Sequence, residues 1–126
     1  MIVLDTHAWV WWMSDPKRLS RRAAQAIERA DAIGVCTMSV FELVGRVQQG
    51  RIQLTQPARG WVRQALAHDR VTSLPLSVEV ALDAAQLRFG GDPADRIIYA
   101  TARAEDAQLV TRDERLRAFD RERTVW

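Results

Sequence analysis

Cysteine, lysine and histidine are all scarce in this sequence of 126 residues, which has one cysteine, one lysine and two histidines. A single cysteine excludes a disulfide within the chain. One cysteine and two histidines also fall short of the four ligands that a structural zinc site usually needs. Cys36 lies in the apolar run Ile33-Gly34-Val35-Cys36, so we expect its thiol to be buried and inert.

Long hydrophobic runs are absent too. No apolar stretch approaches the roughly 20 residues that a membrane-spanning helix needs. No basic segment precedes the first apolar run, and Asp5 and His7 interrupt it, so a secretory signal peptide is not expected. We therefore predict a cytoplasmic protein without a membrane partner.

The composition is that of a folded domain. Hydrophobic residues make up 48% and charged residues 27%, which is enough to bury a core in one domain over residues 1–126. The net charge is only +2, but the stretch from Leu43 to Arg70 contains five arginines and only one acid, Asp69. Such a surplus suits a polyanion such as nucleic acid, although an exposed helix face would give the same pattern. A second basic cluster contains Lys17, Arg18, Arg21 and Arg22.

Short apolar runs alternate with helical patterns along the chain. Residues 2–5 predict a strand buried on both faces, and further strands are predicted at residues 33–38, 71–76, 109–111 and, at an edge, 124–126. The helix that Ser77 opens should pack through Val78, Ala81, Leu82 and Ala85. This alternation predicts the α/β class, with three α/β/α layers around a mostly parallel central sheet. Helices are predicted near residues 8–13, 20–30, 39–50, 57–68, from 77, at 92–106 and at 114–119.

Four carboxylates lie just beyond these strands or in the first turn of a helix. Asp5 ends the first strand, and Asp113 closely follows the fourth. Glu42 lies in the first turn after the second strand, and Asp95 lies in the first turn of a later helix. In a parallel sheet at least Asp5, Glu42 and Asp113 converge on the C-terminal edge, which is where ligands bind. Asp95 joins them if its helix starts on that edge.

Most of these acids also have a structural interpretation. Glu42 has the capping-box spacing with Ser39, and Asp95 lies where it would complement a helix dipole. Asp113 is placed to cap the helix that follows it. Asp5 closes a strand, and we expect no capping role for it. A further acid, Asp92, fits an N-cap so well that we leave it out of the predicted site.

Carboxylates gathered without a counter-charge repel one another and raise each other's pKa values. A hard divalent cation such as Mg²⁺ or Mn²⁺, which prefers oxygen ligands, relieves that repulsion. Such ions activate water and stabilise the transition state of phosphoryl transfer, so the four carboxylates predict a metal-dependent nuclease. The hydroxyls of Thr6 and Thr111 are candidates to hold a metal-bound water, whereas a lone histidine at a helix start, His7, is expected to be structural.

The residues around these acids form a set of motifs that covers nearly the whole chain. In order and spacing the set resembles the PIN domain family, specifically the VapC-type toxins of bacterial and archaeal toxin–antitoxin pairs. The motifs are Ile2-Val3-Leu4-Asp5-Thr6, Ser39-Val40-Phe41-Glu42-Leu43, Asp92-Pro93-Ala94-Asp95-Arg96-Ile97-Ile98 and Leu109-Val110-Thr111-Arg112-Asp113.

The resemblance implies an endoribonuclease that depends on Mg²⁺ or Mn²⁺ and leaves a 5′-phosphate and a 3′-hydroxyl. The family's acids map onto Asp5, Glu42, Asp95 and Asp113, with Thr111 as a polar neighbour. Asp5 and Asp95 would be the principal metal ligands. A homodimer and a small VapB-like antitoxin, often with an arginine that reaches the carboxylates, are implied as well. Whether the tryptophans between residues 9 and 12 serve an interface or the core is left open.

Three other functions suit a small α/β domain. A receiver-type signalling domain needs a lysine after a late strand, and Lys17 lies far from any such place. A phosphatase of the haloacid dehalogenase type needs an acid two residues after Asp5, where this chain has His7. A PIN-like scaffold that binds RNA or protein without cutting stays open, although the intact acid set argues against it. The class of RNA cannot be read from arginine positions, because RNA recognition depends on loop shape and stacking.

Overall fold

The fold is described from a computed structural model that covers residues 1–126. Helices separate most of the strands along the chain, and none of the helices is both long and apolar enough to cross a membrane. The elements are β1 (Ile2–Leu4), α1 (Thr6–Ser14), the 3₁₀ helix η1 (Pro16–Arg18), α2 (Arg21–Arg29), β2 (Ile33–Cys36), α3 (Thr37–Gln48), α4 (Ala58–Leu66), β3 (Val71–Leu74), α5 (Val78–Gln86), α6 (Pro93–Ala104), β4 (Gln108–Val110), α7 (Glu114–Phe119) and β5 (Thr124–Val125).

The five strands form one sheet in the order β3-β2-β1-β4-β5, and every pairing is parallel. β1 lies at the centre, where Val3 is opposite Gly34 of β2 on one side and Leu109 of β4 on the other. The predicted edge strand is confirmed as β5, whose Thr124 is opposite Leu109. The predicted three-layer α/β/α class is therefore confirmed, with a sheet that is wholly parallel.

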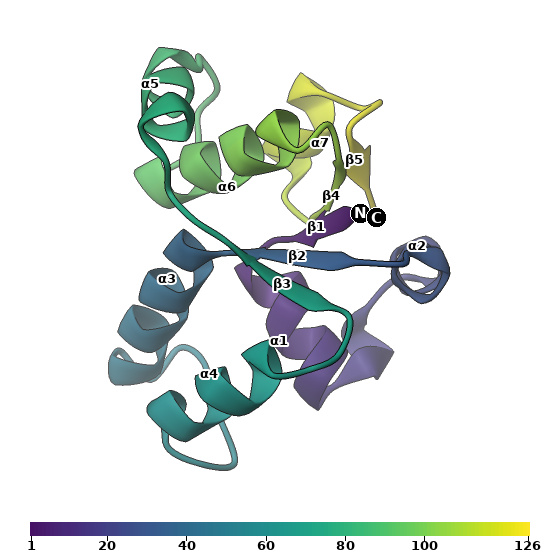
Figure 1. The fold of residues 1–126 in the computed structure, drawn as a ribbon, viewed down its shortest axis with the longest axis vertical. Coiled ribbons are helices and arrows are strands. Elements are labelled where there is room, and N and C mark those ends of the chain that lie inside the picture. Colours follow the sequence, from purple (N-terminus) through teal and green to yellow (C-terminus); the bar gives the residue numbers. More distant parts are fainter.

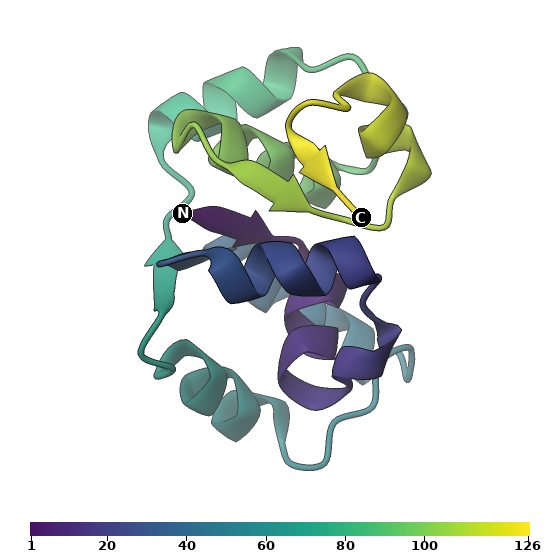
Figure 2. The ribbon, with the colours of Figure 1, turned by 90° about the vertical axis from the view of Figure 1, so that its right-hand side faces the viewer.

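Helices cover both faces of this sheet, as Figures 1 and 2 show, with α1 to α4 on one face and α5 to α7 on the other. Side chains of the buried strands alternate between two hydrophobic cores. In β1, Ile2 and Leu4 pack with the first group of helices, whereas Val3 packs with the second. Both faces of the central strands are thus buried, which explains their unbroken apolar runs.

Several helix starts follow local capping signals. Ser20, Ser77 and Asp92 cap α2, α5 and α6 as predicted, and each side chain accepts a hydrogen bond from a backbone N–H three residues further on. Such a cap satisfies one of the backbone donors that a helix leaves free at its start.

The start of α3 differs from the prediction. The helix begins at Thr37, directly after β2, and its cap residue Cys36 makes no side-chain cap hydrogen bond. Ser39 is fully buried inside the first turn of this helix, so the predicted capping box between Ser39 and Glu42 is wrong. The cause is the length of β2, which ends at Cys36, two residues before the end of the predicted strand at residues 33–38.

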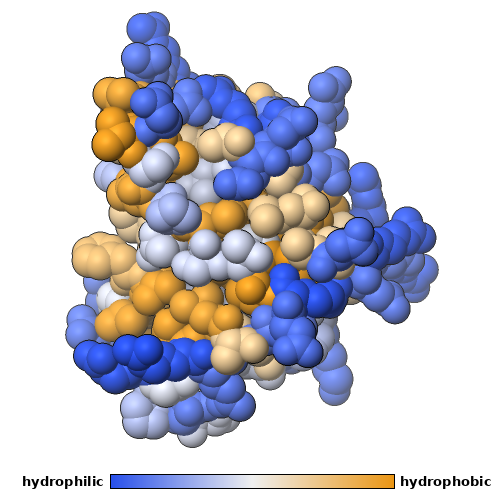
Figure 3. Space-filling model, in the orientation of Figure 1, coloured by the Kyte–Doolittle hydropathy of each residue, from blue (hydrophilic) through white to orange (hydrophobic).

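The buried face of α5 also differs from the prediction. Val80 and Ala84 pack in the core, whereas Val78 and Leu82 are 73% and 56% exposed. Apolar residues lie on more than one side of this helix, and its docking against α6 selects the side that carries the small Ala84. The remaining apolar side chains form a hydrophobic surface over α5 in Figure 3.

The tryptophans of α1 belong mainly to the core. Trp9 is fully buried and packs edge-on against Trp61 of α4, with ring centroids 5.0 Å apart. Trp11 is also buried, and Trp12 is half-buried against the same core. Burial of these rings favours the core interpretation over the interface interpretation for Trp9 and Trp11.

Candidate active site

The starts of α1, α6 and α7 and the middle of α3 surround a cleft of about 630 Å³ next to the ends of β1 and β4. Glu42 lies in the second turn of α3, not in the first as predicted. The four predicted carboxylates, Asp5, Glu42, Asp95 and Asp113, all line this cleft, and so does Thr6. Residues from both halves of the sequence therefore meet at one place. Asp95 joins the other three because α6 begins on the same side of the sheet.

Asp5 both ends β1 and caps α1. Its Oδ1 accepts a hydrogen bond from the backbone N–H of Ala8 at 2.8 Å, so the expectation that Asp5 has no capping role is wrong. Burial raises the pKa of Asp5 to about 6, while hydrogen bonds from the Thr111 hydroxyl and the Ala8 N–H oppose that rise. Asp5 is therefore mainly ionised at neutral pH despite its burial.

Glu42, Asp92 and Asp95 form the most compact acidic group in the cleft, with one oxygen of each within 4.8 Å of the others. Asp92 Oδ1 also accepts a hydrogen bond from the backbone N–H of Asp95 at 3.0 Å. Asp92 is thus the N-cap that the sequence predicts and, in addition, a wall of the cleft. Three carboxylates at this spacing suit a small cation with oxygen ligands.

Burial and neighbouring negative charges both act on Asp95. Burial, first of all, and the negative charges of Asp92, Glu42 and Asp113 together raise the pKa of this half-buried carboxyl to about 7. Repulsion of this kind disappears when a cation sits among the carboxylates. The electrostatics of the cleft therefore fit a divalent metal site.

Asp113 and Thr111 connect the end of β4 to Asp5. Asp113 Oδ1 accepts hydrogen bonds from the N–H groups of Arg115 at 2.8 Å and Leu116 at 3.3 Å, which caps α7. The hydroxyl of Thr111, which is fully buried, accepts the N–H of Asp113 at 3.1 Å and also hydrogen-bonds to Asp5. Thr111 therefore holds two acids of the cleft in place at once.

Thr6 has a different environment from Thr111. Its side chain is 1% exposed, and its hydroxyl has no hydrogen-bond partner within the protein. A buried hydroxyl without a partner costs free energy. A water of a hydrated cation in the cleft would satisfy it, which is a second structural reason to place an ion there.

Basic side chains share the cleft with the acids. The Arg46 guanidinium donates to Glu42 Oε2 at 3.2 Å, with both side chains largely buried. Arg112 lies over the ring of Trp11 at 6.0 Å. Burial lowers the pKa of His7, so this residue lines the cleft as a neutral imidazole at pH 7. The cleft therefore offers carboxylates for a cation and guanidinium groups for phosphates. Its arginines are Arg46, Arg51, Arg112 and Arg115.

The sequence contained a signal for Asp92 that its capping role obscured. An N-cap residue and the third residue of the same helix lie on one turn. If Asp95 lines a cleft, Asp92 is therefore expected to lie at that cleft as well. The arginines had no comparable signal. Arg46, for example, was only one member of a basic stretch, and its pairing with Glu42 requires knowledge of where α3 begins.

Comparisons with known proteins agree with this architecture. Residues 2–122 match the PIN domain. Ribonuclease VapC22 of Mycobacterium tuberculosis is 45% identical to this chain over 127 aligned residues, which cover 99% of this chain and 98% of the relative.

Similar solved structures share the fold at low sequence identity. A toxin–antitoxin complex from Klebsiella pneumoniae superposes with a TM-score of 0.70 at 22% identity, covering 100% of this chain and 97% of that chain. VapBC2 from Rickettsia felis, bound to a DNA fragment from its promoter, superposes with a TM-score of 0.68 at 18% identity, covering 98% and 97%.

Proposed function

Because the chain belongs to the PIN domain family, as a VapC-type member, we propose that it is an Mg²⁺- or Mn²⁺-dependent endoribonuclease and the toxin of a toxin–antitoxin pair. The observation that carries this proposal is the cleft where all four predicted carboxylates meet. Its acids, its arginines and the ribonuclease relative all favour phosphodiester hydrolysis of RNA. The whole chain, residues 1–126, would act as one PIN-like domain in the cytoplasm.

Asp5, Glu42, Asp95 and Asp113 would hold the metal, and Asp92 belongs to the same acidic group. The raised pKa values of Asp5 and Asp95 and the unpartnered hydroxyl of Thr6 support this assignment. When bound, a divalent ion supplies Lewis-acid stabilisation of the charge that develops on the phosphodiester and lowers the pKa of a water.

The chain's own side chains would position the reactants. The Thr6 hydroxyl borders the acids and would orient the attacking water, whereas Thr111 would act by holding Asp5 and Asp113 in place. Arg46 fixes one oxygen of Glu42, and Arg112 lies at the cleft where it can bind a phosphate oxygen of the RNA. Hydrolysis that breaks the P–O3′ bond leaves a 5′-phosphate and a 3′-hydroxyl.

Cleavage of total cellular RNA by the purified protein, with Mg²⁺, with Mn²⁺ and with EDTA, tests the proposal. Asp95→Asn keeps the size of the side chain and removes its charge, and we expect it to lower the cleavage rate at least about a hundredfold, because even outer-shell changes at metal sites cost about 10–100-fold. Asp31→Asn removes an exposed acid outside the cleft and serves as the matched control.

Discrete, metal-dependent fragments that Asp31→Asn retains and Asp95→Asn loses would support the nuclease and its site. Cleavage by Asp95→Asn at the wild-type rate would contradict the site assignment. A folded wild-type protein that binds Mn²⁺ but cuts no RNA would favour the alternative function, a PIN-like module that binds RNA or protein without cutting.

A small VapB-like antitoxin and a second copy of the chain are the proposed protein partners. The similar structures from Klebsiella pneumoniae and Rickettsia felis are complexes of toxin and antitoxin. An arginine of the antitoxin could form ion pairs with the carboxylates of the cleft. For the homodimer, Phe41, Val78 and Leu82 provide large apolar side chains that are mostly exposed, as protein interfaces require.

A further inference from the structure

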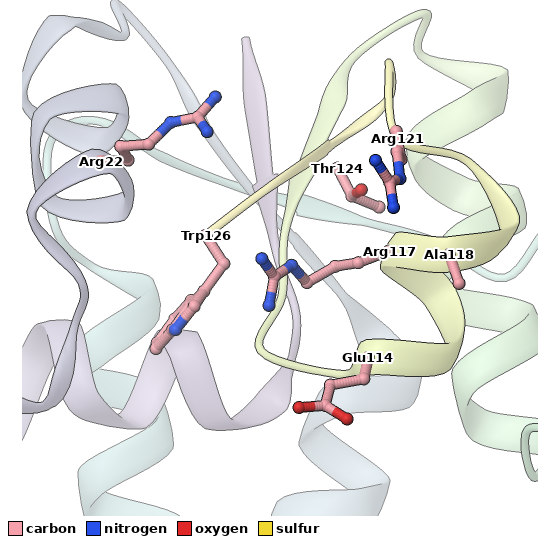
Figure 4. Close-up of a pocket in the computed structure, with 7 residues that line it drawn as sticks. All are labelled: Arg22, Glu114, Arg117, Ala118, Arg121, Thr124 and Trp126. Carbon is pink, nitrogen blue, oxygen red and sulfur yellow. The ribbon is translucent and has the colours of Figure 1, made fainter.

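A second hollow, of about 410 Å³, lies beside the β5 edge of the sheet. Figure 2 shows α2 and α7 flanking this edge. Arg22 reaches the hollow from α2, Arg117 from α7, and Arg121 from the segment after α7, while Trp126 follows β5. Figure 4 shows Arg117 extending toward Trp126 and Arg121 lying beside Thr124, with Arg22 on the other side of the hollow.

The three arginines of this hollow are free to bind a ligand. None of them makes an ion pair or a side-chain hydrogen bond, whereas other arginines of the protein do pair with acids, as Arg46 does with Glu42. The hollow contains one acid, Glu114, so its lining carries a surplus of positive charge. An anionic ligand would gain charge-assisted hydrogen bonds there without first breaking any.

This hollow lies next to the carboxylate cleft. Glu114 lines both. Trp126 of the hollow packs against Trp11 of the cleft, with ring centroids 5.7 Å apart. Asp113 of the cleft and Arg117 of the hollow are one helical turn apart on α7, where the Arg117 N–H donates to the Asp113 carbonyl at 3.0 Å.

We propose that the hollow formed by Arg22, Arg117, Arg121 and Trp126 is an RNA exosite, which binds single-stranded RNA that extends from the carboxylate cleft. The guanidinium groups bind phosphates, and the half-buried indole of Trp126 provides a stacking surface for a base. This inference rests on the proposed function, because it assumes that the strand in the cleft is RNA. It adds a site for the part of the substrate that lies away from the scissile bond.

The composition of the hollow favours RNA over a peptide. Only two of its seven lining residues are hydrophobic, whereas an amphipathic helix needs an apolar groove to bind. Guanidinium groups next to an aromatic ring are the combination that binds single-stranded nucleic acid without regard to sequence. An acidic peptide would use the charges but would gain little from Trp126.

Binding of fluorescent single-stranded RNAs of increasing length, measured by anisotropy in EDTA over a range of salt concentrations, tests this exosite. The double variant Arg117→Gln/Arg121→Gln removes two charges from the hollow. Each lost phosphate contact on a single strand lowers the salt dependence of log K by about 0.7, so we expect a slope about 1.4 smaller than that of the wild type. The affinity that the wild type gains with RNA length should be lost as well.

Arg59→Gln/Arg63→Gln is the matched control. Both arginines are exposed and unpaired on α4, which packs next to β3 at the opposite edge of the sheet. This variant changes the net charge equally and should keep the wild-type slope. Trp126→Leu should weaken binding about fivefold or more without changing the slope, since stacking involves no phosphate. Thermal unfolding of each variant verifies that it is folded.

Equal salt slopes for the two double variants would overturn the exosite. The salt dependence of RNA binding would then come from the net charge of the protein and not from the arginines of this hollow. Unchanged RNA binding together with lost binding of an oligoglutamate peptide would also overturn it and assign the hollow to an acidic protein segment. Cleavage with Mn²⁺ is measured in parallel. If the wild type cuts no RNA but Arg117→Gln/Arg121→Gln still shows the expected loss of slope in EDTA, the proposed nuclease fails while the binding site stands.

Discussion

Asp92 Oδ1 accepts a hydrogen bond from the backbone N–H of Asp95 at 3.0 Å, and both side chains line the same cleft. One carboxylate thus stabilises the start of α6 while its charge acts on the carboxylate beside it. Two substitutions separate these effects, because asparagine caps a helix about as well as aspartate whereas alanine does not.

Asp92→Asn should leave the unfolding free energy of the metal-free protein unchanged or slightly raised, and weaken Mn²⁺ binding by about tenfold. Asp92→Ala should weaken Mn²⁺ binding similarly and also cost about 1 kcal/mol of stability through the lost cap. Calorimetric Mn²⁺ titration and urea unfolding measure the two quantities. Wild-type Mn²⁺ affinity in Asp92→Asn would show that Asp92 is only a helix cap.

The raised pKa values of Asp5 and Asp95 predict how stability depends on pH. Both groups bind a proton more tightly in the folded protein, at about 6 and about 7, than at their ordinary value of 3.8. Their contribution to the stability of the metal-free protein is therefore greatest below about pH 4 and is lost as the pH rises through 6 and 7. Urea unfolding in EDTA across this range should show the decline.

Asp95→Asn should remove the part of that decline in stability that occurs near pH 7. At pH 8 we expect it to raise the unfolding free energy by about 1 kcal/mol, after discounting for solvent at this half-buried group, or about 3–6 °C in melting temperature. With Mn²⁺ present the wild-type trend should reverse, because metal binding requires ionised carboxylates. A metal-free stability that rises between pH 5 and pH 8 would contradict the assigned repulsion.

Local signals in the sequence predicted the fold well. The apolar runs located all five strands, and the caps at Ser20, Ser77 and Asp92 are each decided within a few residues. The predictions failed where contacts between elements determine which side chains are buried. The apolar residues of α5 allow more than one buried face, and contact with α6 selects the face of Val80.

Part of the arrangement of the candidate cleft also follows from the sequence. The parallel sheet brings Asp5, Glu42 and Asp113 to one edge, which follows from topology alone. The structure adds the capping role of Asp5, the proximity of Asp92 and the pairing of Glu42 with Arg46. These depend on where individual helix turns begin, and a shift of two residues, as at the start of α3, changes which side chains meet.

The ion pair between Arg46 and Glu42 leads to the last prediction. Arg46 brings a positive charge to a cleft that would bind a divalent cation, and it occupies one oxygen of Glu42 at 3.2 Å. Arg46→Gln removes that charge and frees the oxygen, so Mn²⁺ binding should tighten. The largely buried pair contributes about 0.5–1 kcal/mol, which corresponds to about a two- to fivefold gain in affinity.

RNA binding should change in the opposite direction, because Arg46 is one of the guanidinium groups of the cleft that would face the phosphates of the proposed RNA substrate. Arg46→Lys keeps the charge and is the control, with Mn²⁺ affinity expected within about twofold of the wild type. Mn²⁺ titration and RNA anisotropy in EDTA measure both effects on the same preparations. If Arg46→Gln weakened Mn²⁺ binding instead, Arg46 would be required to hold Glu42 in its ligand position, and orientation of that carboxylate would outweigh the removal of charge.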